Sequence, residues 1–221
     1  MRRLLAFVLS LLALPLGPAA AQESERRFKL LGPEEMTPAQ KALAQSIRSG
    51  PRASVQGSAA NTGGGPIGSP FNVFLRSPEL GEPLQQVGSY IRFKSSLGMR
   101  LNEMAILIVA REWTAQYEWF AHHRLALQAG LDPRIPDDIA HRRRPAGMKP
   151  DEQAVYDFVR ELLDTRQVSD TTYKSATEKF GEQGVMDLIG VTGYYTLVAM
   201  VLNVDRTPIP DGGKPPLPPL K

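Results

Sequence analysis

Apolar side chains recur every three to four residues through most of the chain between residues 80 and 202. At this spacing side chains share one face of an α-helix, whereas no stretch alternates convincingly at the period of two typical of a half-buried strand. No repeat of 20–50 residues is apparent. The pattern predicts an all-α fold, with helices over residues 38–48, 80–96, 101–111, 115–129, 136–141, 151–164, 170–181 and 185–202.

The expected helix ends carry residues that suit those positions. Thr37 and Pro38 fit the N-cap and the first position of the first helix, and Gly50 would end it. Thr114 is the expected N-cap of the 115–129 helix, and Ser169 is that of the 170–181 helix. These signals support the helical assignment independently of the apolar period.

The last predicted helix, residues 185–202, is apolar around most of its circumference and has no charge between Asp187 and Asp205. A membrane span is one interpretation. The polar residues in and beside this helix, among them Thr192 and Asn203, favour a buried central helix instead. Gly190 and Gly193 would let a neighbouring helix approach closely.

The N-terminus has the three-part pattern of a secretory signal peptide over residues 1–21. A basic start, Met1–Arg3, precedes an apolar run from Leu4 to Leu16, and the small residues Ala19–Ala21 suit a cleavage site. An uncleaved anchor is the alternative, but the run is shorter than a membrane span requires. We therefore expect export, a periplasmic location and no stable membrane insertion after cleavage.

Irregular segments are expected on both sides of the helical region. Residues 22–70 are predicted to hold one helix and a flexible linker, because residues 50–70 contain six Gly and three Pro. Residues 207–221 contain six Pro and are expected to form a frayed tail, with an extended arm on a neighbouring subunit as the alternative. A helical domain over residues 71–206 lies between them.

Composition narrows the possible functions. The 221 residues include no cysteine, which excludes disulfides, thiol catalysis and cysteine-ligated metals. The net charge is +3, but signal-peptide removal takes Arg2 and Arg3, so two fewer than 26 basic residues would face 23 acidic ones. The only dense basic run is Arg142–Arg144, so nucleic acid is a poor candidate partner.

Candidate chemistry gathers around Glu103 and residues 111–123. Glu118 and His122 are four residues apart and share a helix face, so the carboxylate would orient and charge the imidazole for proton transfer. A solvated ion pair is the alternative, but Tyr117 and Trp119 indicate that this helix faces the core. Known metal, nucleotide and serine-hydrolase motifs are missing, so neither a metal nor a cofactor is expected.

Several short motifs in order resemble the carboxymuconolactone decarboxylase-like family, which also includes alkyl hydroperoxidase D. They cover roughly residues 70–206 and comprise Arg100-x-x-Glu103-x-x-Ile106, Tyr117-Glu118-Trp119-x-x-His122, Ala129-Gly130-Leu131, Val168-Ser169-Asp170, Phe180-Gly181-Glu182 and Gly193-Tyr194-Tyr195. The resemblance implies an all-helical, alkyl hydroperoxidase D-like fold that assembles into homo-oligomers, often built from trimers.

The resemblance also implies a site. The hydroperoxidase branch carries a Glu, a C-x-x-C and a His; Glu103 and His122 match the first and last, whereas Ala115 and Glu118 occupy the cysteine positions. The missing thiols disfavour peroxide reduction. Decarboxylation of a small carboxylated lactone or related carboxylate is favoured, with His122 as proton donor. A non-catalytic oligomeric ligand-binding module is the alternative.

The expected catalytic residues are therefore Glu103, Glu118 and His122. Glu118 orients and charges the imidazole, and Glu103 completes the relay. Expected substrate-binding residues are Tyr117, Trp119, Tyr194 and Tyr195, with core packing as the alternative for at least one of the last two.

Overall fold

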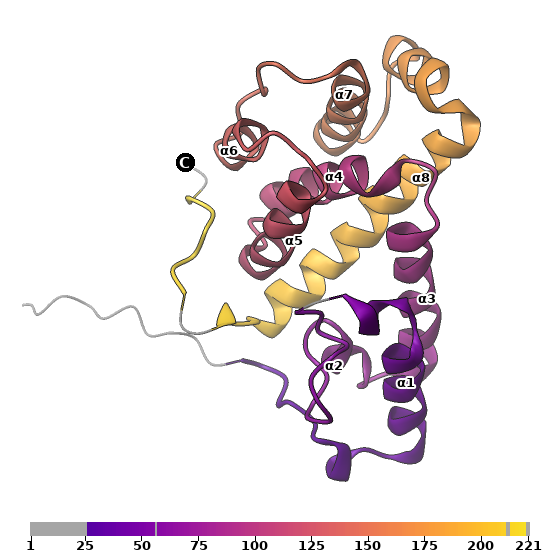
Figure 1. Cartoon of the computed structure of the whole chain (residues 1–221), viewed down its shortest axis with the longest axis vertical. Coiled ribbons are helices and arrows are strands. Elements are labelled where there is room, and N and C mark those ends of the chain that lie inside the picture. The colour runs from indigo at the N-terminus through magenta and orange to yellow at the C-terminus, as the bar shows by residue number, and fades with distance from the viewer. Residues whose placement is uncertain (1–25, 56, 211–212, 220–221) are drawn as a thin grey trace, which may run out of the picture.

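The computed structural model describes residues 26–55, 57–210 and 213–219, and within these ranges the chain is helical and has no strand (Figure 1). The predicted all-α class is confirmed. The predicted signal peptide, residues 1–21, lies outside the described residues. Two short 3₁₀ turns, Pro33–Glu35 and Pro51–Ser54, accompany the α-helices α1 (Pro38–Ser49), α2 (Phe71–Phe74), α3 (Pro78–Phe93), α4 (Gly98–Glu112), α5 (Gln116–Gln128), α6 (Arg134–Ala140), α7 (Pro150–Thr165) and α8 (Asp170–Asp205).

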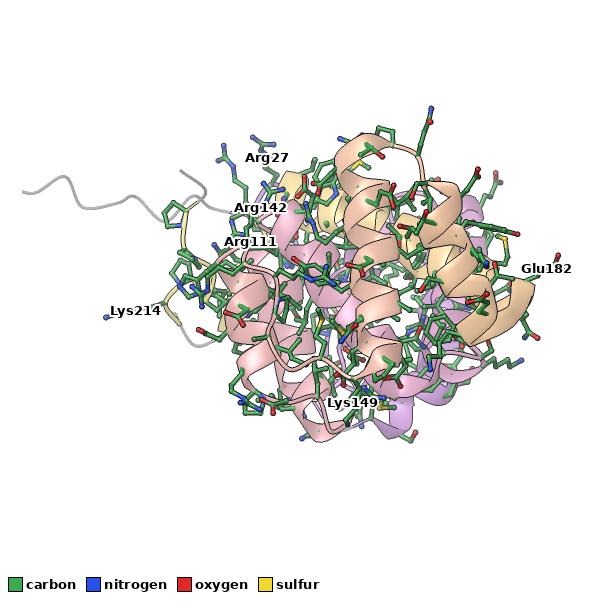
Figure 2. All side chains as sticks on the ribbon, turned by 90° about the horizontal axis from the view of Figure 1, so that it is seen from above. Arg27, Arg111, Arg142, Lys149, Glu182 and Lys214 are labelled. Atoms are coloured by element: carbon green, nitrogen blue, oxygen red, sulfur yellow. The ribbon has the colours of Figure 1, made fainter. Side chains whose placement is uncertain are left out.

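Helix α4 is the centre of the main hydrophobic core. Every residue from Leu101 to Arg111 is buried, and the helix packs against α5, α7 and α8. Because apolar side chains surround it on all sides, its sequence is apolar around its circumference rather than along one stripe. Most charged side chains lie at the surface, as Figure 2 shows for Lys149, Glu182 and Lys214, but Glu103 and Arg111 of α4 are buried.

Helix α8 crosses between two groups of helices, with α4 to α7 on one side and α1 to α3 on the other (Figure 1). Ser169 caps its N-terminus by accepting a hydrogen bond from the Thr172 amide, as predicted. Gly181 interrupts the helix with φ 68° and ψ 178°, a conformation that glycine adopts readily. The two helices predicted on either side of Gly181 are therefore two arms of one kinked element.

Among the described helices, α8 is the one long and apolar enough to cross a membrane, but 56% of that apolar stretch is buried within the protein. This packing matches the predicted central helix. One face of α8 nevertheless stays exposed, with Met186 at 61% and Val204 at 50% of full exposure. Gly190 and Gly193 belong to this face, because a Cβ built on either glycine meets no atom within 4 Å. No described helix of the same chain makes the close approach predicted for them.

Residues 26–70, here called the N-terminal arm, fold onto the helical domain. Ala60 and Ile67, in the segment predicted to be a flexible linker, are buried in a second hydrophobic cluster with Ile47, Phe71 and Leu75. That prediction was wrong because a Gly/Pro-rich composition excludes regular structure without excluding tertiary packing. Helix α1 within the arm forms as predicted, and Thr37 and Gln40 close a capping box at its start.

The buried Asp205 at the end of α8 fastens the arm to the domain. Its carboxylate lies 3.1 Å from the Arg26 guanidinium and accepts hydrogen bonds from the Phe28 amide at 3.1 Å and the Ser69 hydroxyl at 3.4 Å. Thr207, just beyond α8, donates a further hydrogen bond at 2.6 Å. A buried carboxylate with this many donors couples the two ends of the described chain.

The Pro-rich tail is also tied down, contrary to the prediction of a frayed terminus. Leu217 is 2% exposed, and its backbone exchanges two hydrogen bonds with the side chain of Gln116. The buried guanidinium of Arg111 donates to the Pro218 carbonyl at 2.7 Å. Arg111 also donates at 3.0 Å to the side chain of Thr114, which has φ 47°; Ala115, not Thr114, is the N-cap residue of α5.

Candidate functional site

Glu103 and His122 form a buried pair between two neighbouring helices. The short turn at residues 113–115 folds α5 back against α4, and this packing brings the two side chains together. His122 Nδ1 lies 2.6 Å from Glu103 Oε2. Because an ionised carboxylate only accepts hydrogen bonds, the proton between them is placed on Nδ1, which leaves Nε2 for exchange with another group.

Glu118 lies beside this pair without joining it. The carboxyl is 1% exposed, and neither oxygen has a hydrogen-bond partner among the described residues. The i,i+4 spacing predicted a hydrogen bond between Glu118 and His122; that prediction was wrong, because Glu103 holds the ring. Burial raises the pKa of Glu118 well above its ordinary value. Burial therefore favours the protonated form of this carboxyl.

Two tyrosines of α8 pack edge-on against the pair. The Tyr195 and His122 ring centroids are 5.0 Å apart at 84°, and those of Tyr194 and Tyr195 are 5.3 Å apart at 89°. Burial raises the pKa of Tyr195 well above its ordinary value and that of Tyr194 to about 12. Both phenols are neutral at physiological pH and are available as hydrogen-bond donors.

A cavity of about 230 Å³ adjoins these groups, between the N-terminal arm and helices α3, α5 and α8. Five of the seven predicted site residues line it: Tyr117, Glu118, His122, Tyr194 and Tyr195. Glu103 does not line the cavity itself but is hydrogen-bonded to His122, which does. Trp119 does not line this cavity but borders a different one, with His123 and Pro136, so its predicted substrate-binding role stays a prediction. Its ring packs in the core and stacks on His123, with centroids 5.9 Å apart.

The sequence did not indicate that the N-terminal arm forms one wall of the cavity. Arg52 and Phe71 line it from this side, and Arg92 of α3 contributes a second guanidinium. Arg52 is 2% exposed, donates a hydrogen bond of 3.3 Å to Gln85 Oε1 and lies 5.2 Å from the Phe71 ring centroid. Its solitary charge in a Gly/Pro-rich segment was the signal that sequence reasoning passed over.

Gly88 of α3 allows this wall to form. A Cβ on Gly88 would lie 2.2 Å from Tyr194 Oη and 2.7 Å from Arg52 Nη2. The phenol and the guanidinium thus approach the helix backbone where any other residue would place a methyl group. This close approach requires glycine although the backbone of Gly88 is helical.

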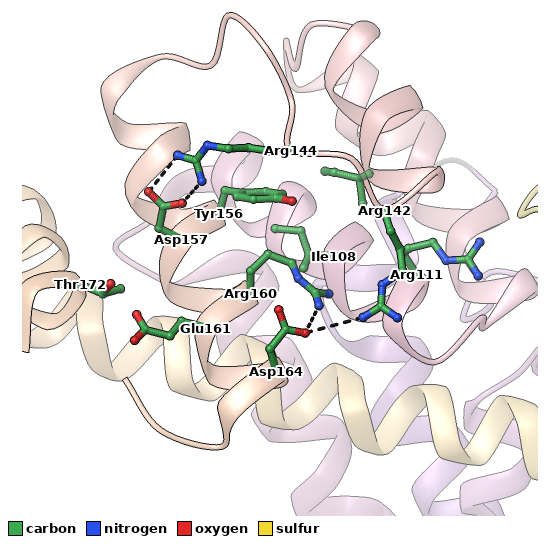
Figure 3. A pocket seen from close by; sticks show the side chains of 11 residues that line it. Ile108, Arg111, Arg142, Arg144, Tyr156, Asp157, Arg160, Glu161, Asp164 and Thr172 are labelled. Atoms are coloured by element: carbon green, nitrogen blue, oxygen red, sulfur yellow. Dashed lines mark hydrogen bonds and ion pairs between the residues drawn. The ribbon is translucent and has the colours of Figure 1, made fainter. Parts of the chain in front are cut away.

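A second cavity, of about 550 Å³, opens between α4, α6 and α7 and is rich in arginine (Figure 3). Three of its four arginines face carboxylates: Arg144 pairs with Asp157, and Arg142 and Arg160 pair with Asp164 (Figure 3). Since these charges are neutralised within the chain, this cavity is a weaker candidate for an anionic ligand. No group of three or more potential metal-ligating side chains occurs in the described parts of the chain.

Neither a protein-family model nor a curated protein matches the sequence. A solved structure does match: the crystal structure of a protein of unknown function from Agrobacterium tumefaciens, for which an identity as the antioxidant defence protein AhpD has been suggested. The TM-score is 0.56 at 14% sequence identity, and the match covers 63% of this chain and 96% of the other. The fold is AhpD-like. At this identity the match establishes the arrangement of helices and no activity.

Proposed function

We propose that this AhpD-like protein is a decarboxylase of the carboxymuconolactone decarboxylase-like type, acting on a small carboxylated lactone or a related carboxylate. The observation that supports this most directly is the buried Glu103–His122 hydrogen bond of 2.6 Å beside a cavity of about 230 Å³. A carboxylate-oriented imidazole is an established device for general acid–base catalysis.

The reaction needs a proton donor rather than an oxidant. The bond between the substrate carbon and its carboxylate breaks, carbon dioxide leaves, and the electron pair remains as an enolate-like anion. His122 delivers a proton from Nε2 to that carbon, and Glu103 stabilises the imidazolium beforehand. Glu118, held neutral by burial, is a second proton donor, and the Tyr195 ring fixes the imidazole plane.

Peroxide reduction, the activity suggested by the name of the structural neighbour, has less support. The sequence has no cysteine, and the positions matched to the two thiols hold Ala115 and Glu118. A proton relay without a thiol has no group to accept the peroxide oxygen. Thiol-dependent peroxide turnover by the purified protein would contradict the proposed function.

Carbon dioxide release from a panel of carboxylated lactones is the direct test. We expect His122→Ala to lower kcat/KM by roughly 10²- to 10⁴-fold, the usual contribution of a positioned acid–base group. The matched control is His123→Gln, which changes the neighbouring imidazole, outside the cavity, and is expected to keep full turnover. Folded His122→Ala protein with unchanged turnover would refute the proposal, and wild-type protein that binds but never turns over these compounds would favour the non-catalytic ligand-binding alternative.

Two further parts of the proposal concern assembly and location. The family resemblance and the exposed apolar face of α8, which includes Met186, Ile189, Met200 and Val204, support a homo-oligomer. Light scattering on the purified protein tests this, and a monomer at micromolar concentration would refute it. Export with cleavage after Ala21 is tested by sequencing the N-terminus of protein recovered from the periplasm.

A further inference from the structure

Arg52 is a buried cation without a carboxylate partner at the edge of the cavity. Within the described part of the chain its guanidinium forms one hydrogen bond, to the neutral Gln85, and a cation–π contact with Phe71, and it forms no ion pair. Arg111, the other deeply buried arginine, differs because its guanidinium donates to two backbone carbonyls and a hydroxyl. A buried guanidinium with so little internal compensation is costly unless a ligand supplies the missing negative charge.

The other charged side chains around the cavity do not supply this negative charge. Glu118, the carboxyl that lines the same cavity, forms no hydrogen bond or ion pair with Arg52 in the described structure, and Glu103 is hydrogen-bonded to His122. Arg92, which lies over the ring of neighbouring Phe93, and Arg124 of α5 also line the cavity and add two further positive charges. The cavity is therefore positive overall and bounded by aromatic rings, a combination that suits a small flat organic anion.

We propose that Arg52, supplied by the N-terminal arm, is the residue that recognises a carboxylate of the substrate, assisted by Arg92 and the Tyr194 hydroxyl. That the bound anion is a substrate rests on the proposed function, whereas the anion site itself is argued from residues other than Glu103 and His122. Arg52 suits this role because its planar guanidinium can donate two parallel hydrogen bonds to a carboxylate. Because Gly88 has no side chain, the Arg52 guanidinium and the Tyr194 phenol both approach the backbone of α3 at this residue.

The carboxylate held by Arg52 is one that the substrate retains. Carbon dioxide is neutral, so a cation that bound the departing carboxylate would stabilise the ground state more than the transition state and slow the reaction. A retained carboxylate is held equally in both states. Loss of Arg52 is therefore expected to raise KM with a much smaller change in kcat.

Binding of benzoate compared with benzamide tests the assignment without requiring turnover, because the two probes have similar shapes and differ in charge. We expect calorimetry to show tighter binding of benzoate to the wild-type protein. In Arg52→Gln the affinity for benzoate should fall roughly 10- to 100-fold, the range for a charge-assisted hydrogen bond, while that for benzamide changes little. The benzoate affinity of Arg52→Lys should lie between those of the wild type and Arg52→Gln, because lysine keeps the charge but cannot donate two parallel hydrogen bonds.

Lys41→Gln is the matched control, because it removes one positive charge from the same arm at an exposed site outside the cavity. It should leave benzoate binding unchanged. A purely structural Arg52 would make Arg52→Gln less stable without changing the preference for benzoate. We expect instead that the unliganded variant unfolds at the same or a higher temperature, because an uncompensated buried charge is gone.

The results separate this inference from the proposed function. Benzoate binding that is lost in Arg52→Gln, with no carbon dioxide release from any lactone, would support the anion site and refute the decarboxylase. Lactone turnover with the same KM in Arg52→Gln as in the wild type would support the decarboxylase and refute the anion site. Wild-type protein that binds benzoate no better than benzamide, or not at all, would overturn the assignment of Arg52.

Discussion

The neutral Glu118 predicts an unusual pH dependence of stability. Its carboxyl is 1% exposed without a hydrogen-bond partner in the described structure, and burial raises its pKa well above the ordinary value. In the unfolded chain a glutamate ionises near pH 4.3. Between that pH and the raised folded pKa, folding therefore requires Glu118 to take up a proton.

The sign follows from proton linkage. The folded state binds one more proton than the unfolded state, so the stabilising contribution of Glu118 is complete below about pH 4.3 and decreases as the pH rises toward the folded pKa. The loss is at most about 1.4 kcal/mol per pH unit, equivalent to about 3–6 °C in Tm for a chain of this size. Glu118→Gln carries no ionisable group and escapes this loss.

Urea unfolding of the wild type and Glu118→Gln at pH 4.5, 5.5, 6.5 and 7.5, followed by tryptophan fluorescence, measures this difference. We expect the two proteins to be similar at pH 4.5 and the variant to gain on the wild type by up to about 1.4 kcal/mol per unit as the pH rises. Glu182→Gln, at an exposed position, controls for net charge and should show a nearly constant difference. A constant difference for Glu118→Gln as well would refute the neutral, buried carboxyl.

Two other substitutions test the contacts that build the site. Gly88→Ala places a methyl 2.2 Å from Tyr194 Oη, so we expect the unfolding free energy to fall by about 1–3 kcal/mol. Adding Tyr194→Phe, which removes that oxygen, should restore part of the loss. A single Gly88→Ala variant as stable as the wild type would contradict the close approach. Asp205→Ala removes the buried partner of Arg26 and should cost about 3–5 kcal/mol and expose the arm to trypsin, whereas Asp164→Ala, at a half-exposed ion pair, should cost less than about 1 kcal/mol.

Local physics made the helices predictable. Thr37 and Ser169 cap helices where expected, because the capping hydrogen bond involves residues only three apart. The polar residues of the sequence grouped Glu103 with residues 111–123, and the motif resemblance pointed to Glu103 and His122; the two side chains are 2.6 Å apart in the structure. The i,i+4 rule alone chose the wrong partner for His122, because tertiary packing against α4 outweighed a neighbour on the same helix.

Long-range packing was the part that the sequence left open. Residues 50–70 have no helical period, so nothing local indicates that Ala60 and Ile67 are buried or that Arg52 reaches the cavity. Trp119 is a second residue whose tertiary packing the local sequence did not reveal. Its position beside Glu118 suggested a place in the site, but consecutive residues of a helix point about 100° apart, and its ring turns into the core.

The missing cysteines and the N-terminal arm together account for the character of the site. Glu118 stands where the motif resemblance predicts a thiol, and under the proposed function the Glu103–His122 pair serves proton transfer rather than peroxide reduction. Arg52, from the N-terminal arm, adds a buried positive charge with no ion-pair partner among the described residues, so the cavity combines the Glu103–His122 pair with the anion site proposed above.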